Sequence, residues 1–398
     1  MKLSHIMDRF IQKVLYLSMF FLPFREPLIY HHLEDAPLIL KQRKKTRIFI
    51  VTDKNLYEQD FFKKLINLFK TEGISFTVFH ETLPNPSIQQ IEEIFEAYQT
   101  FGADCILAVG GGSVIDASKG VGIRLTHPNK SLQKMKGILK VWKKQPLLIA
   151  VPTTAGTGSE ATVACVVTDL KTHEKYAIND PVIIPKIAIL DPICTEKLPK
   201  HIVSTTGMDA LTHAVEAYIG KSNTFKTKRM ALSAMKLIRQ NLLVAYQENT
   251  YESRVNMLLA SYQAGVAFTR AYVGNVHALA HQLGGMYHTP HGLANAVLLP
   301  KVLRYYGKTV EKKLASLSDY LSLTEETLTR QGKAQAFISW IESLNTLMNI
   351  PSKIDQTIQD DEKKLMSIRA YKEANPLYPV PMIFELSDFE TLYSLISK

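Results

Sequence analysis

The run DCILAVGGGSVIDASKG, residues 104–120, places a strand, a glycine turn and a helix in direct succession. The largely apolar run at residues 104–109 predicts a buried strand. Gly110, Gly111 and Gly112 follow and let the backbone approach a ligand closely. The N–H groups that begin the next helix present partial positive charge, which suits a phosphate. The run is not GxGxxG, so it indicates a phosphate-binding turn through its strand and helix context rather than its spacing.

The surrounding sequence repeats this alternation. Apolar, β-branched runs predict further strands at residues 47–52, 75–79, 147–151 and 187–190, and helical spacing marks residues 58–70 and 87–100. Strands alternating with helices predict a parallel sheet covered on both faces. After residue 192 the β-rich runs stop and helical patterns follow, for example at residues 226–241 and 251–268.

A chain of 398 residues is long enough for two domains. We expect an α/β dinucleotide-binding domain at residues 28–193 and an all-α metal-binding domain at residues 194–398, packed closely with a cleft between them. Residues 1–27 form a leader. Its apolar run, residues 14–24, is shorter than the roughly 20 residues of a membrane span and lacks a signal cleavage site. We expect it to pack on the protein or on a partner subunit, with membrane-surface association as the alternative.

The composition is that of a globular protein, with 46% hydrophobic and 21% charged residues. The net charge of +10 would attract polyanions, but the basic clusters at residues 41–47 and 134–144 lack the interleaved aromatic residues of a base-stacking surface. We therefore expect no nucleic-acid partner. Three scattered cysteines exclude a disulfide framework and predict a reducing, cytoplasmic location.

Two further features border the predicted nucleotide site. The loop VPTTAGTGSE, residues 151–160, also follows a strand, and its hydroxyls can bond a diphosphate or ribose; an ordinary polar connection is the alternative. Asp53 follows the first strand, where a carboxylate accepts from both ribose hydroxyls and repels a 2′-phosphate. It predicts NAD rather than NADP, unless Asp53 is a solvated turn residue.

Four of the twelve histidines lie within residues 274–292, at positions 277, 281, 288 and 291. His277 and His281 are four residues apart on a predicted helix, as are Asp209 and His213 in the run GMDALTHA. One carboxylate and three imidazoles suit iron(II) or zinc with room for a substrate oxygen. The candidates exceed the four ligands needed, so one histidine must do something else.

The runs GGGSVIDASKG, PTTAGTGSEAT, GMDALTHAVEAY and HALAHQLGG…TPHG, in this order, resemble the iron-containing (group III) alcohol dehydrogenase family from about residue 28 to the end. The resemblance implies a dehydroquinate synthase-like fold with the dinucleotide between two lobes. It implies that Asp209, His213, His277 and His291 hold the metal, while His281 lies beside it and acts in catalysis. The residues that we expect at the cofactor are Asp53, Asn85, Gly110, Gly111, Gly112, Ser113, Asp116, Thr153, Thr154, Thr157, Ser159 and Lys175.

We therefore predict a homodimeric or larger enzyme that oxidises a primary alcohol to an aldehyde, or the reverse, with Fe²⁺ or alternatively Zn²⁺ and with NAD. A glycerol dehydrogenase-like polyol oxidoreductase and a non-redox scaffold subunit are the alternatives. A dehydroquinate synthase-like enzyme would need a basic cluster beside the histidine helix, where only Arg270 stands. Arg270, Tyr272 and Asn275 depart from the family pattern, so the substrate does not follow from the resemblance.

Overall fold

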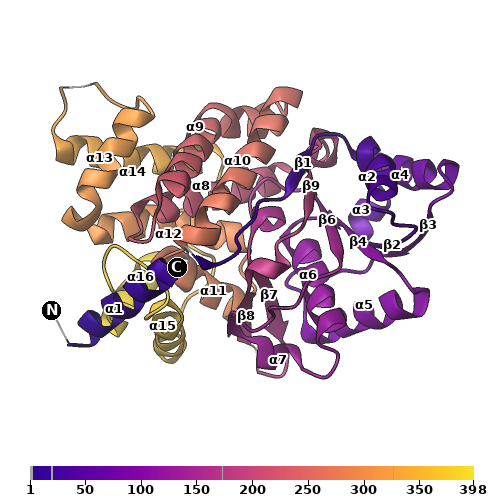
Figure 1. Ribbon diagram of the computed structural model, residues 1–398. Coiled ribbons are helices and arrows are strands. Elements are labelled where there is room, and N and C mark those ends of the chain that lie inside the picture. The colour runs from indigo at the N-terminus through magenta and orange to yellow at the C-terminus, as the bar shows by residue number, and fades with distance from the viewer. Residues whose placement is uncertain (1–2, 19–20, 173, 326) are drawn as a thin grey trace. The chain divides into compact units, whose positions relative to one another are not determined.

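A computed structural model describes residues 3–18, 21–172, 174–325 and 327–398, and the chain divides into two compact units (Figure 1). One unit is Pro23–Leu198. The other joins Pro199–Lys398 to the N-terminal segment Met1–Leu22.

The first unit is built on a six-stranded sheet in which every neighbouring pair is parallel, which confirms the sheet expected from the sequence. The strands, in spatial order, are β1 (Leu28–Tyr30), β9 (Ile187–Ile189), β6 (Leu147–Pro152), β4 (Cys105–Gly110), β2 (Arg47–Val51) and β3 (Ser75–Phe79).

Helices cover both faces of this sheet because successive residues of a strand point to opposite sides. In β4, Ile106 and Ala108 join the core under α5 (Ile88–Phe101) and α6 (Gly112–Thr126). Cys105 and Leu107 join the opposite core, under α2 (Ala36–Gln42) and α4 (Asp60–Thr71). A one-turn helix, α3 (Lys54–Tyr57), follows β2.

A second, smaller sheet was not expected from the sequence. Its strands are β5 (Gly137–Ile138), β8 (Glu174–Asn179) and β7 (Ala164–Asp169), in that order, and the short helix α7 (Leu132–Met135) precedes them. β7 and β8 pair antiparallel and bury alternate residues only, so their polar residues interrupt the apolar run that marks a fully buried strand.

The second unit contains only helices among its described residues, which confirms the expected all-α region. They are α8 (Lys200–Ile219), α9 (Phe225–Gln247), α10 (Tyr251–Ala271), α11 (Asn275–Tyr287), α12 (His291–Tyr306), α13 (Lys308–Tyr320), α14 (Arg330–Leu347), α15 (Asp360–Ala374) and α16 (Leu386–Ile396), together with α1 (Leu3–Ser18). α12 approaches α8 closely at Gly292, where a Cβ atom would lie 2.3 Å from the Thr205 carbonyl oxygen. A glycine there lets the helix that begins at His291 reach α8.

The N-terminal helix α1 packs on its own unit through polar side chains, and Figure 1 draws it beside α16. Arg9 donates to the carbonyl oxygens of Val380 (2.7 Å) and Pro381 (3.1 Å), and Gln12 donates to that of Tyr378 (2.8 Å). Met19 and Phe20 of the apolar leader run lie outside the described residues. No described helix is long and apolar enough to cross a membrane.

Candidate active site

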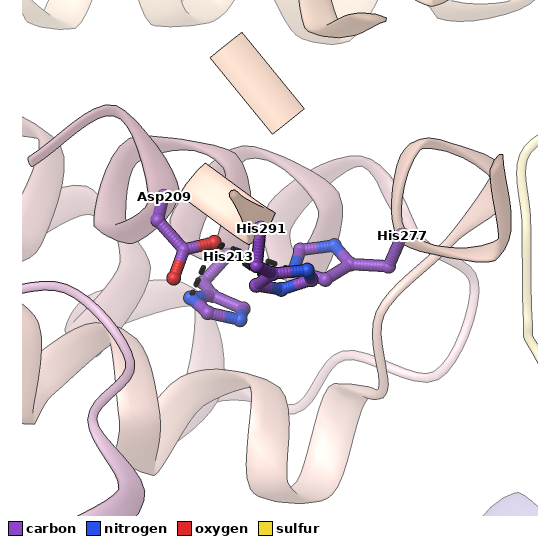
Figure 2. Close-up of side chains that lie close together, drawn as sticks. All are labelled: Asp209, His213, His277 and His291. Atoms are coloured by element: carbon purple, nitrogen blue, oxygen red, sulfur yellow. Dashed lines mark ion pairs between the residues drawn. The ribbon is translucent and has the colours of Figure 1, made fainter. Parts of the chain in front are cut away.

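Four predicted metal ligands converge in the helical unit (Figure 2). Asp209 and His213 come from α8, His277 from α11, and His291 opens α12. Their candidate ligand atoms all lie within 4.8 Å of one another, and Asp209 Oδ1 is 3.6 Å from His291 Nε2 and 3.8 Å from His277 Nε2. A tetrahedral ion with bonds of about 2.1 Å sets its ligand atoms about 3.4 Å apart. The two Asp209 distances exceed this spacing by only a few tenths of an ångström, whereas pairs as far apart as 4.8 Å would have to close by about 1.4 Å around a single ion.

A buried carboxylate orients His277. Glu216 accepts hydrogen bonds from the His277 ring at Nδ1 (2.6 Å) and from the backbone N–H groups of Gly274 and Val276 (2.8 Å each). Burial lowers the pKa of His277 to about 3, so the ring is neutral at physiological pH, and it raises the pKa of Glu216 to about 7. With its proton on Nδ1, His277 keeps the lone pair of Nε2 for the cluster.

Two other side chains hold the cluster together. The amide nitrogen of Asn295, one turn after His291 in α12, donates to Asp209 Oδ1 (2.6 Å) and lies 3.2 Å from Nε2 of both His277 and His291. The ring of Phe268 stacks on that of His213 at 4.1 Å between centroids. Hydrogen bonding and stacking thus restrict the side chains before any ion binds.

Glu216 and Asn295 were not among the predicted site residues, although both leave a trace in the sequence. Glu216 lies seven residues after Asp209 and three after His213, which places all three polar side chains on one face of a largely buried helix. Asn295 lies four residues after His291. A polar residue at helical spacing from a predicted metal ligand could therefore have indicated both residues.

The remaining two histidines are separated from the ligand set in different ways. The ring of His281 lies beside that of His291, 5.1 Å away and tilted by 17°, and its Nδ1 is 2.6 Å from Glu373 Oε1. His288 is exposed and ends α11 in the left-handed conformation, at φ 54°. The geometry therefore keeps His281 at the cluster and leaves His288 outside it.

In the α/β unit, the glycine turn and the threonine loop contact each other at the ends of β4 and β6. A Cβ atom on Gly112 would lie 2.8 Å from Thr157 Cγ2, and one on Gly111 would lie 3.2 Å from Thr154 Oγ1. Thr153 donates its backbone N–H to the Gly110 carbonyl (3.2 Å). Neighbouring strands thus bring together two loops that are 40 residues apart in the sequence.

Asn85 and Lys175 join the same group of predicted cofactor residues. The Asn85 backbone N–H donates to Ser113 Oγ (3.1 Å), and Lys175 Nζ donates to Asn85 Oδ1 (2.8 Å). Asn85 has φ 55°, a left-handed conformation that asparagine tolerates better than most residues. A charged amine therefore stands beside the start of α6, where the first N–H groups lack helical partners.

Asp116 and Ser159, two further predicted cofactor residues, are hydrogen-bonded to each other. Ser159 Oγ donates to Asp116 Oδ1 (2.6 Å), and the Val166 N–H donates to Oδ2 (3.1 Å). Burial raises the pKa of Asp116, and the nearby ammonium of Lys119 opposes that shift. Their predicted contact with the cofactor stays a prediction.

Lys119 was not among the predicted site residues either; it is fully buried on α6, three residues after Asp116. Its ammonium donates to Ser159 Oγ (3.0 Å), to Thr162 Oγ1 (2.9 Å) and to the Ala164 carbonyl (2.6 Å). Burial lowers its pKa, while Asp116 raises it. Lys119 thus fastens the threonine loop to α6.

Asp53 is the N-cap of α3, and its Oδ1 accepts from the Leu56 N–H (3.0 Å). This bond accounts for one carboxylate oxygen. The predicted contact of Asp53 with the ribose stays a prediction.

Comparison with known proteins connects both units to one family. The model of the iron-containing alcohol dehydrogenase family matches residues 30–192, and that of the C-terminal region of Fe-containing alcohol dehydrogenases matches residues 203–395. The 1,3-propanediol dehydrogenase of Citrobacter freundii is 38% identical over 334 residues, 83% of this chain and 86% of that protein. The NADPH-dependent butanol dehydrogenase of Clostridium saccharobutylicum is 35% identical over 79% of this chain and 82% of its own length.

A solved structure, the alcohol dehydrogenase from Oenococcus oeni, superposes with a TM-score of 0.90 at 32% identity, over 94% of this chain and all of that one. The resemblance drawn from the four sequence runs is thereby confirmed. Both family matches fall outside α1. The chain belongs to the iron-containing alcohol dehydrogenase family and is an oxidoreductase of alcohols and aldehydes.

Proposed function

We propose that the chain interconverts a small primary alcohol and its aldehyde at the cluster of Asp209, His213, His277 and His291, with NAD as the hydride carrier. In the oxidative direction the alcohol loses a hydride to NAD⁺ and a proton to solvent. The observation that carries the proposal is the convergence of four candidate ligand atoms within 4.8 Å in a family of iron-containing enzymes.

The residues present suit a divalent ion. His277 is held neutral and turns an unprotonated nitrogen to the cluster, and Asp209 adds one negative charge. An ion bound by these residues supplies a Lewis acid that lowers the pKa of the alcohol hydroxyl. Imidazole and carboxylate ligands fit both iron(II) and zinc, so the family identity favours iron.

For the dinucleotide, we propose that the glycine turn and the start of α6 hold the phosphates, with Asn85, Lys175 and the threonine loop around them. The support is the contact of these segments with one another at the ends of β4 and β6. Asp53 would favour NAD by repelling a 2′-phosphate. One similar protein is named for its use of NADPH, so this preference belongs to the individual chain rather than to the family.

The polyol alternative has one specific observation in its favour, since a similar protein is a 1,3-propanediol dehydrogenase. That diol also presents a primary hydroxyl, so both readings place the same reaction at the cluster. A scaffold subunit with a degenerate site is disfavoured by the retained ligand geometry. We further propose a homodimer or larger homo-oligomer, and a cytoplasmic location because Cys105, Cys165 and Cys194 are all free and buried.

The test is to purify the protein without added metal, determine bound iron and zinc by elemental analysis, and follow NADH absorbance. The substrates are ethanol, butanol, 1,2-propanediol, 1,3-propanediol and glycerol. We expect NADH from primary alcohols in proportion to metal content. Metal-loaded protein that forms no NADH or NADPH from any of them would contradict the proposal.

A further inference from the structure

Glu373 of α15 contacts His281, the histidine beside the cluster that is not one of the four predicted metal ligands. His281 Nδ1 lies 2.6 Å from Oε1 of Glu373, in the last turn of α15. A carboxylate oxygen accepts, so a hydrogen is on Nδ1, and in the neutral ring the lone pair is on Nε2. The His281 ring lies beside the ring of His291. This contact therefore fixes both the tautomer and the plane of an imidazole at the cluster.

Glu373 is itself held from two further sides. Tyr378, four residues beyond α15, donates its hydroxyl to the same Oε1 (2.8 Å), and Gln282, next to His281, donates its amide to Oε2 (2.9 Å). Rotation of the carboxylate would break bonds to three side chains at once. Three side chains therefore restrain the Glu373 carboxylate, although the His281 and Glu373 side chains are 18% and 24% exposed.

The same device occurs at His277, where Glu216 contacts Nδ1 at the same distance of 2.6 Å. There the fixed tautomer turns Nε2 to the ligand cluster. At His281 it leaves Nε2 on a ring that is not one of the four ligands. A nitrogen fixed in this way serves a reacting group better than one that exchanges tautomers.

We propose that Glu373 is a positioning residue that holds His281 in the Nδ1–H tautomer, with Nε2 available to the substrate hydroxyl. The inference rests on the proposed alcohol oxidation at this cluster. Glu373 acts through His281 and Tyr378 supports it.

The first experiment determines the tautomer of His281 directly, in metal-free protein labelled with ¹⁵N-histidine. Long-range ¹H–¹⁵N spectra distinguish the two tautomers, and the signal that His281→Gln removes identifies His281. We expect Nδ1–H in the wild type. Glu373→Leu and Glu373→Ala are measured in parallel, so that a folding failure of one leaves the other, and both should shift towards the Nε2–H form that free histidine favours.

The second experiment measures kinetics of the metal-loaded enzyme with NAD and an alcohol. Glu373→Leu should lower kcat by about 10- to 100-fold, with KM values within about twofold and metal content unchanged. Glu373→Gln keeps an oxygen that accepts from Nδ1, so it should restore the tautomer and most of kcat. The matched control is Glu362→Gln, because Glu362 joins the same two helices by accepting from the Tyr287 hydroxyl (2.6 Å).

A wild-type tautomer or a wild-type kcat in Glu373→Leu and Glu373→Ala overturns the proposal. Equal losses in the Gln and Leu variants also overturn it, since charge rather than orientation would then matter. If the wild type oxidises no alcohol, the proposed function fails. The spectra of the metal-free protein still decide whether Glu373 sets the tautomer.

Discussion

Two polar clusters of the molecule differ in whether the protein itself supplies a positive charge. In the α/β unit, Lys119 brings its own cation and bonds it to Ser159, Thr162 and the Ala164 carbonyl. In the helical unit, Asp209 and the imidazoles turn acceptor atoms to one another, and the described donor shared among them is the single amide of Asn295. The first cluster supplies its own cation, whereas we propose that the second binds one. The balance of donors and acceptors therefore distinguishes a structural ionic cluster from a binding site.

The strongest test of this contrast removes the carboxylate of the cation-requiring cluster. Asp209→Ala should lower metal affinity by more than the 10- to 100-fold typical of residues that only orient ligands, about 100-fold or more, with a parallel loss of turnover. His291→Ala should act in the same direction. Elemental analysis after dialysis against a weak chelator measures the effect.

The neighbouring histidines provide the controls. His281→Ala should retain the metal and lose turnover, and His288→Ala, at an exposed helix end, should retain both. Equal metal retention in Asp209→Ala, His291→Ala and His281→Ala would show that the ligand assignment is wrong.

The opposite intervention removes the cation that the α/β unit supplies. Lys119→Met should destabilise the protein by about 3–5 kcal/mol, because it leaves the largely buried Asp116 carboxylate, 13% exposed, and several acceptors without the ammonium. Urea unfolding measures the change, and the metal content of the folded fraction should stay the same.

A second substitution sharpens this result. Asp116→Asn in the Lys119→Met background removes the uncompensated charge. The double variant should therefore lose less unfolding free energy than the two single variants lose together. Additive losses would mean that Lys119 and Asp116, 3.8 Å apart, do not interact.

An intermediate effect is expected from the carboxylate behind His277. Glu216→Gln keeps the shape and one acceptor oxygen but removes the charge beside Nδ1. Metal affinity should fall about 10- to 100-fold while the fold persists. Competition with a fluorescent chelator measures it, and an affinity within twofold of the wild type would remove Glu216 from the site.

Local sequence signals predicted the parallel sheet and the glycine turn because both depend on neighbours in the chain. The apolar runs around β4 and β6 fix buried strands, and parallel strands carry their loops to one edge. The metal ligands came from spacing combined with family resemblance. Spacing alone could not decide whether His281 or His291 is a metal ligand, because both lie near His277 in the sequence.

Long-range pairings were beyond local signals. Glu373 reaches His281 across 92 residues and Lys119 reaches Thr162 across 43, so neither partner shares a periodic pattern with the other. A lysine or glutamate on a helix is usually solvated, and only the fold shows that Lys119 is buried and that Glu373 is bonded to other side chains. For Asp53, the sequence showed its position after a strand, but it did not show that its carboxylate accepts from the Leu56 N–H.

Asp53 allows a smaller and more specific test at the cofactor. Asp53→Ser keeps a residue that can cap α3 and removes the negative charge. If that charge repels a 2′-phosphate, the ratio of kcat/KM for NADP over NAD should rise about 10-fold or more. Steady-state kinetics with both cofactors measures it; an unchanged ratio would leave Asp53 a capping residue only.

The smallest expected effect concerns a partly buried cation, Arg9 of α1, which lies outside both family matches. Like Lys119 it is satisfied by the protein, through the carbonyls of Val380 and Pro381. Arg9→Ala should cost about 1–3 kcal/mol and leave metal content unchanged, because the bonds are to neutral acceptors in one segment.

Amide hydrogen exchange of residues 378–385 should rise in Arg9→Ala and stay unchanged in Lys13→Ala, which alters an exposed residue of the same helix. Since Gln12 holds the carbonyl of Tyr378 and Tyr378 supports Glu373, faster exchange there would connect α1 to the residues around His281. Equal exchange in both variants would confine α1 to packing. The bonds of Arg9 would then stabilise α1 without affecting the residues around His281.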